Sequence, residues 1–156
     1  MTINTIQKPV IPKDQIILLV EDNQDDVDLT LRAFNKNDLG DRIVVVRDGE
    51  EALNYIYAAG AYSENDNFRR IQVVFLDLKL PKIDGLEVLR RLRIEERTRY
   101  LPVVVLTSSD EERDMTECYH LGVNSYVRKP IGFEQFVSTA NQLGIYWLGI
   151  NQFPSS

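Results

Sequence analysis

Short apolar runs alternate along this chain with longer segments in which apolar residues recur every three or four positions. The runs are rich in β-branched side chains, a pattern typical of strands that are buried on both faces of a parallel sheet. They predict five strands, at 16–20, 43–46, 72–76, 103–106 and 125–127.

The segments between these runs predict helices. An acidic stretch at 24–26 suits the N-terminus of the first helix, and residues 37–40 end it. The second helix is expected over 50–59, the third opens at Asp84 and Gly85, and the fifth follows Gly132. Residues 109–112 (Ser-Asp-Glu-Glu) match a capping box ahead of the fourth, which runs to about Leu121. Strands and helices in alternation predict a doubly wound α/β fold, with a five-stranded parallel sheet between flanking helices.

Composition sets the domain organisation and excludes several classes of protein. A chain of 156 residues, 44% of them hydrophobic, suits one globular domain over 15–144, with an N-terminal extension at 1–14 and an aromatic C-terminal extension at 145–156. No apolar stretch approaches the roughly 18 residues of a membrane span, and the start lacks the pattern of a signal peptide. The net charge of −6 argues against binding to nucleic acid or anionic membranes. The single cysteine, Cys118, suits a reducing cytoplasm.

The candidate chemistry lies where the predicted strands end. Glu21 and Asp22 follow the first strand, Asp77 the third, Thr107 the fourth, and the fifth leads to Lys129. In a doubly wound sheet these ends converge on one crevice. Two carboxylates about 4 Å apart repel by about 4 kcal/mol at an effective dielectric near 20, a cost that a bound cation removes. Carboxylate ligands with added waters and phosphate oxygens favour Mg²⁺.

The same residues supply what phosphoryl transfer needs. Asp77 can act as the nucleophile, because carboxylates form acyl-phosphate intermediates. The hydroxyl of Thr107 can hydrogen-bond a phosphoryl oxygen, and Lys129 brings a point charge on a flexible stem. Asp77 alone could simply cap a strand end; its four companions favour a phosphoryl-transfer site.

Four segments resemble the receiver domain of two-component response regulators, and the resemblance covers nearly the whole chain. They are LLVEDN at 18–23, LDLKLP at 76–81 followed by Asp84 and Gly85, LTS at 106–108, and YVRKP at 126–130. The resemblance implies that Asp77 accepts a phosphoryl group from a phosphohistidine of a sensor histidine kinase. It implies no enzymatic activity beyond self-phosphorylation and autodephosphorylation. A histidine phosphotransfer protein could then receive the phosphate onward.

The resemblance also implies a set of metal ligands. Asp22 and Asp77 would bind Mg²⁺ directly, Glu21 through water, and Lys79 through its backbone carbonyl. Mn²⁺ or Ca²⁺ could substitute for Mg²⁺.

The switch between two states is implied in the same way. Thr107 and Tyr126 would form the switching pair, with Tyr126 turning inward when Thr107 engages the phosphate. The alternative for Tyr126 is a half-buried aromatic residue without a switching role. The peptide bond between Lys129 and Pro130 would be cis.

A long loop at 60–70 and the aromatic tail are similar to those of single-domain regulators that partner phytochrome kinases, which tend to be homodimers. Only about a dozen residues follow the last receiver helix, so we expect no effector module. The apolar tail residues are predicted to form the dimer interface, with packing onto their own domain as the alternative. They are Tyr146, Trp147, Leu148, Ile150 and Phe153.

Two other functions, one that shares the aspartyl nucleophile and one that shares the fold, are disfavoured by particular residues. A Mg²⁺-dependent phosphohydrolase of the haloacid-dehalogenase kind also uses an aspartyl nucleophile, but it needs a second acid two residues later, where this chain has Lys79. A flavodoxin-type electron carrier needs a hydroxyl-rich phosphate loop after the first strand, where this chain has Glu-Asp-Asn-Gln-Asp at 21–25.

Overall fold

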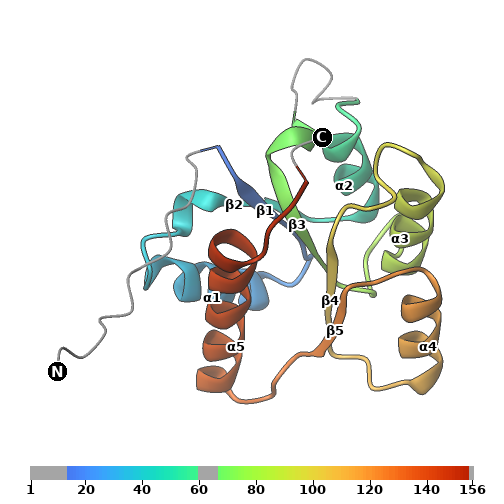
Figure 1. Cartoon of the computed structure of the whole chain (residues 1–156). Helices are drawn as coiled ribbons and strands as arrows, with labels where there is room; N and C mark the ends of the chain where they lie inside the picture. The colour runs from blue at the N-terminus through green and yellow to red at the C-terminus, as the bar shows by residue number, and fades with distance from the viewer. Residues whose placement is uncertain (1–13, 60–66, 155–156) are drawn as a thin grey trace, which may run out of the picture.

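The computed structural model describes residues 14–59 and 67–154 (Figure 1). Its five strands form one parallel sheet in the order β2-β1-β3-β4-β5, which confirms the predicted sheet. Each predicted strand lies within one residue of the observed bounds, because an unbroken apolar run marks both ends of a buried strand. The strands are β1 Ile16–Val20, β2 Ile43–Val46, β3 Ile71–Leu76, β4 Val103–Thr107 and β5 Ser125–Arg128.

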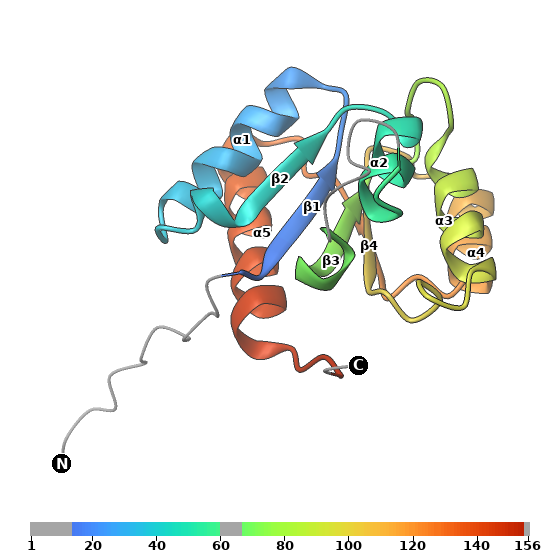
Figure 2. The ribbon, with the colours of Figure 1, turned by 90° about the horizontal axis from the view of Figure 1, so that it is seen from above.

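The helices cover both faces of the sheet, so the doubly wound prediction is confirmed. Helices α1 and α5 lie on one face, and α2, α3 and α4 lie on the other (Figures 1 and 2). Each face has its own apolar core, and alternate residues of the central strands enter one core or the other. The helices are α1 Gln24–Asn35, α2 Gly49–Ile56, α3 Gly85–Ile94, α4 Glu112–His120 and α5 Phe133–Ile145.

Three of the helices begin with a side chain that caps the first turn. Asn23, Asp48 and Asp84 accept a hydrogen bond from the backbone N–H three residues later, at the starts of α1, α2 and α3. These helix starts follow the ends of β1, β2 and β3 along the chain. The caps therefore fix where the chain turns at the carboxyl edge of the sheet.

The capping box predicted at 109–112 is wrong. Helix α4 begins at Glu112, and its N-cap residue Glu111 makes no side-chain capping bond. The hydroxyl of Ser109 instead donates to Asp114 Oδ2 at 2.6 Å and accepts from the backbone N–H of Glu111 at 3.3 Å. These bonds shape the loop between β4 and α4 and delay the helix.

The C-terminal extension packs partly onto its own domain. After α5 the chain forms a π-helical turn, Tyr146–Ile150 (η4), in which Trp147 and Leu148 join the core beneath α1 and α5. Tyr146, Ile150 and Phe153 remain exposed. Figure 1 shows this segment at the end of the sheet where β3 begins. Packing onto their own domain, the alternative to a dimer interface, therefore holds for Trp147 and Leu148, two of the five tail residues.

Parts of three sequence features lie outside the described residues: the N-terminal extension up to residue 13, the loop segment 60–66, and residues 155–156 of the C-terminal extension. In the described part of the chain, every helix is too short or too polar to cross a membrane.

Candidate functional site

The carboxylates at the strand ends lie together at the carboxyl edge of the sheet. Glu21 and Asp22 follow β1, and Asp77 follows the neighbouring strand β3. Backbone hydrogen bonds fix two of these positions: Glu21 N donates to Val46 O at 3.0 Å, and Asp77 N donates to Val20 O at 3.2 Å. One oxygen from each of the three carboxylates lies within 4.8 Å of the others. The topology thus brings the predicted acidic residues into one cluster.

Lys129, which follows β5, reaches into this cluster. Its Nζ lies 2.6 Å from Glu21 Oε1, 2.8 Å from Asp26 Oδ2 and 3.0 Å from Asp77 Oδ2. The side chain is only 8% exposed. Its backbone N–H donates to Thr107 O at 2.7 Å, at the end of β4. One buried ammonium group therefore forms ion pairs with three carboxylates.

The pKa values of two groups in the cluster, Glu21 and Lys129, are both raised, but for different physical reasons. Burial raises the pKa of Glu21 to about 7, and the charge of Asp77 adds to this rise, whereas the hydrogen bond and charge of Lys129 lower it. Burial by itself lowers the pKa of Lys129, but its hydrogen bonds to Asp26 and Glu21 and the charge of Asp77 outweigh this and raise that pKa. The lysine therefore stays protonated, and a further cation beside Glu21 would act against the effect of burial on its pKa.

The donor set fits an oxygen-coordinated divalent cation. Glu21 and Asp77 are buried, while Asp22 is exposed and leaves one side of the cluster open to water. Mg²⁺ takes few carboxylates and keeps several waters, which matches a half-open cluster of three acids. The backbone N–H of Lys79 donates to Asp77 Oδ1 at 3.4 Å. The ligand role of the Lys79 carbonyl stays a prediction.

Thr107 and Tyr126 are joined through the loop after β4. The Thr107 hydroxyl is buried and accepts from the backbone N–H of Ser109 at 3.3 Å. The half-buried Tyr126 donates from its hydroxyl to the carbonyl of the same Ser109 at 3.1 Å. One loop residue therefore contacts both predicted switch residues, while their switching role stays a prediction.

Asp26 is the site residue that sequence reasoning missed. The sequence indicates only that its acidity complements the N-terminus of α1, but its carboxylate pairs with Lys129. The position of Asp26 in the predicted fold could have indicated its role. Helix α1 starts at the carboxyl edge of the sheet, so its first turn faces the same crevice.

The prediction of a cis bond before Pro130 is wrong. The described residues contain no cis peptide bond. The trans form of a bond before proline is intrinsically favoured by about 0.5–1 kcal/mol, and Lys129 reaches Asp77 from the trans form.

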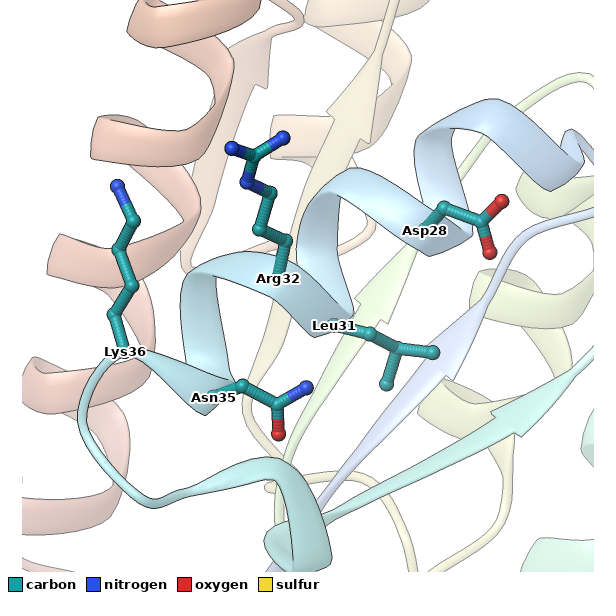
Figure 3. Close-up of a pocket in the computed structure, with 5 residues that line it drawn as sticks. All are labelled: Asp28, Leu31, Arg32, Asn35 and Lys36. Atoms are coloured by element: carbon teal, nitrogen blue, oxygen red, sulfur yellow. The ribbon is translucent and has the colours of Figure 1, made fainter.

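A separate pocket lies on the outer surface of α1. It is lined by Asp28, Leu31, Arg32, Asn35 and Lys36, shown in Figure 3. Arg32 and Lys36 also line a second pocket, which continues onto α5. Both pockets lie on helix surfaces, and none of their lining residues belongs to the carboxylate cluster.

Comparison with known proteins identifies a family for most of the chain. The model described as "Response regulator receiver domain" matches residues 17–141. A relative named as a probable methanogenesis regulatory protein, FilR2 of Methanothrix harundinacea, is 43% identical over 139 residues, covering 89% of this chain and 87% of that protein.

Two solved structures share both the fold and detectable sequence identity. The phosphorylated cyanobacterial phytochrome response regulator RcpA superposes with a TM-score of 0.83 at 35% identity, covering 90% of this chain and 99% of RcpA. The Mn²⁺-bound form of response regulator Rcp1, a protein of Synechocystis sp., superposes with a TM-score of 0.82 at 31% identity, covering 90% and 99%.

Proposed function

The chain belongs to the response regulator receiver family, and from that premise we propose that Asp77 is its phosphoacceptor. Receiver domains are partners of sensor histidine kinases, so the donor is a phosphohistidine of such a kinase. The observation that carries the proposal is the contact of Lys129 Nζ with Asp77 Oδ2 at 3.0 Å, beside two further carboxylates at the same edge of the sheet.

In the proposed reaction, a carboxylate oxygen of Asp77 attacks the phosphorus atom. A P–O bond forms, the P–N bond to the donor histidine breaks, and the histidine nitrogen keeps the electron pair and takes up a proton. Lys129 offsets negative charge on the phosphoryl oxygens, and the buried hydroxyl of Thr107 is available to donate to one of them. The residues position and stabilise the transferred group, and only autodephosphorylation would follow as a hydrolytic activity.

We propose that Glu21, Asp22 and Asp77 hold Mg²⁺, with Glu21 acting through water and the Lys79 carbonyl completing the set. The bound ion would supply positive charge to the phosphoryl oxygens. The Mn²⁺-bound structure of Rcp1 supports a divalent ion in this family, and Mn²⁺ or Ca²⁺ could replace Mg²⁺.

The output is proposed to be a change in the loop between β4 and α4. A phosphoryl group on Asp77 that accepts a hydrogen bond from the Thr107 hydroxyl would reorient this hydroxyl, which also accepts from Ser109 N. The carbonyl of Ser109 also accepts from Tyr126, so the aromatic side chain would respond to the same event.

The proposal is tested by phosphorylation with a small acyl phosphate and Mg²⁺, followed by intact mass measurement. The wild type is expected to gain one phosphoryl adduct, and Asp77→Asn none. Asp110→Asn, which removes an exposed carboxylate in the loop after β4, is the matched control and should label like the wild type. A wild type that stays unlabelled would contradict the proposal. The family match gives no support to the phosphohydrolase alternative, which predicts turnover of phosphate esters instead.

We further propose that the receiver domain spans 15–144 between the two extensions and that the protein acts in the cytoplasm. For the phosphoryl donor, we propose a phytochrome-type kinase. The likeness to RcpA supports the kinase type, and the likeness to FilR2 makes a different sensor the alternative. Onward transfer to a histidine phosphotransfer protein would use the same aspartyl phosphate.

We propose that the exposed residues of the C-terminal extension form the interface of a homodimer. Tyr146, Ile150 and Phe153 present apolar surface to solvent beside Trp147 and Leu148, which belong to the core. An exposed apolar patch of this kind is typical of an interface. Removing the whole extension would also remove core residues, so a surface substitution is the sharper test.

Ile150→Asp is expected to convert a dimer into a monomer, because a charge replaces apolar contact area at the interface. Ile150 is 55% exposed, so the substitution leaves the core intact. Sedimentation measures the change, and Ile131→Asp, at a fully exposed isoleucine before α5, is the control that should stay dimeric. A monomeric wild type, or an Ile150→Asp protein that remains a dimer, would refute the interface.

A further inference from the structure

We propose that Asp26 is a positioning residue for Lys129, an inference that rests on the proposed function of the site. Asp26 Oδ2 lies 2.8 Å from Lys129 Nζ and is one of three carboxylates around that ammonium group. The other two, Glu21 and Asp77, belong to the cluster that can bind a cation, whereas Asp26 does not. Lys129 therefore has two partners that belong to the candidate cation cluster and one that lies outside it.

This difference matters when a divalent ion is present. If Glu21 and Asp77 turn their oxygens toward an ion, their attraction for Lys129 weakens, because each carboxylate then shares its charge between two cations. Asp26 remains as an anionic partner that keeps the amine beside Asp77. Without it, binding of the ion would separate Lys129 from its two remaining carboxylates and leave a buried ammonium group with little compensation.

The position of Asp26 suits this role. It comes from the first turn of α1, whereas Glu21 and Asp77 follow strands. The Asp26 backbone N–H donates to the side chain of the N-cap Asn23, and the Asp26 carbonyl accepts from the Thr30 hydroxyl. Hydrogen bonds therefore fix both backbone polar groups of Asp26. The Asp26 side chain is 23% exposed, in contrast to 3% for Glu21 and 8% for Asp77. Asp26 is therefore the most solvent-exposed of the three carboxylates that contact Lys129.

The experiment compares Asp26→Asn with Asp25→Asn. Both substitutions remove one carboxylate from the first turn of α1, so effects on net charge and on the helix N-terminus are matched. Asp25 is exposed, and Lys129 makes its three ion pairs elsewhere. The bonds of Asp26 to Asn23 and Thr30 use its backbone atoms, so the Asp26→Asn substitution leaves them in place.

Two measurements are made on each protein. Mg²⁺ affinity is measured by calorimetry without any phosphate donor, and the rate of Asp77 labelling is measured at saturating Mg²⁺. Asp26→Asn is expected to weaken Mg²⁺ binding about tenfold, a size typical of residues that orient metal-site side chains, and to slow labelling. Asp25→Asn should change neither by more than about twofold. Asp26→Glu, which restores a carboxylate, should recover part of both losses.

The outcomes separate the two proposals. Asp26→Asn with Mg²⁺ affinity and labelling equal to those of Asp25→Asn would overturn the positioning role. A wild type that binds Mg²⁺ but is never labelled would overturn the phosphoacceptor function, while a selective loss of affinity in Asp26→Asn would still support the positioning of Lys129. If Asp26→Asn fails to fold, Asp26→Ser and Asp25→Ser are compared in its place, and equal Mg²⁺ affinity of these two proteins would overturn the positioning role.

Discussion

Replacing Lys129 with methionine is expected to lower the free energy of unfolding by about 3–5 kcal/mol when no divalent ion is present. The ammonium group is the shared ion-pair partner of Glu21, Asp26 and Asp77, and it is almost fully buried. Methionine fills similar volume but leaves three neighbouring carboxylates without their cation. Denaturant unfolding with a chelator measures the loss.

Mg²⁺ is expected to restore most of the stability of Lys129→Met, because Glu21, Asp22 and Asp77 can bind a cation that replaces the missing charge. Lys82→Met is the matched control. Lys82 also pairs with two carboxylates, Asp48 at 3.7 Å and Glu50 at 3.8 Å, but its side chain is 61% exposed. Its loss should therefore cost less than about 1 kcal/mol. Equal stability of Lys129→Met and Lys82→Met in chelator would contradict this description of the cluster.

The same variant should show a pH dependence of known sign. Burial raises the pKa of Glu21 to about 7 in the folded protein, while Lys129 acts to lower it. Without Lys129 that pKa should rise further. An acid whose pKa is higher in the folded state loses its stabilising contribution as the pH rises through that folded pKa. The stability deficit of Lys129→Met in chelator should therefore be larger at about pH 8 than at about pH 6.

The fold could be predicted from the sequence because two independent patterns agree. Runs such as 16–20 and 103–106 are too short for helices and too apolar for surface strands. Alternation with helical segments then leaves a parallel sheet as the consistent topology. The same topology brings Glu21, Asp77 and Lys129 together, since residues after parallel strands share one edge.

Side-chain pairing could not be predicted in the same way. Asp26 has two electrostatic partners within reach, the N-terminus of α1 and Lys129, and its position in the sequence reveals only the first. Ser109 satisfies the pattern of a capping box but bonds to Asp114 instead. For Trp147 and Leu148, apolar character predicts burial without saying which surface covers them; here it is their own core.

Gly85→Ala is expected to displace the backbone of the phosphoacceptor loop. A Cβ atom at Gly85 would overlap the backbone carbonyl of Asp77 and lie 2.7 Å from the Cα of Leu78. The sequence predicts that Gly85 opens a helix. The structure shows a second reason for a glycine at this position: α3 begins in direct contact with the Asp77 backbone. Gly85 N also donates to Leu78 O at 2.9 Å, so the loop cannot retreat without losing this bond.

Overpacking against backbone typically costs about 1–3 kcal/mol and sometimes more, so Gly85→Ala should lose about 3 kcal/mol of unfolding free energy. Its rate of labelling by an acyl phosphate should fall as well, because Asp77 must move. Gly132→Ala, at the N-cap of α5, is the control: there the three atoms nearest to an added Cβ all belong to the flexible side chain of Gln135, and the cost should stay below about 1 kcal/mol. If the two variants were equally stable and equally labelled, the position of Asp77 would not depend on the contact with Gly85. A selective loss in Gly85→Ala would mean that the start of α3 helps to position the phosphoacceptor.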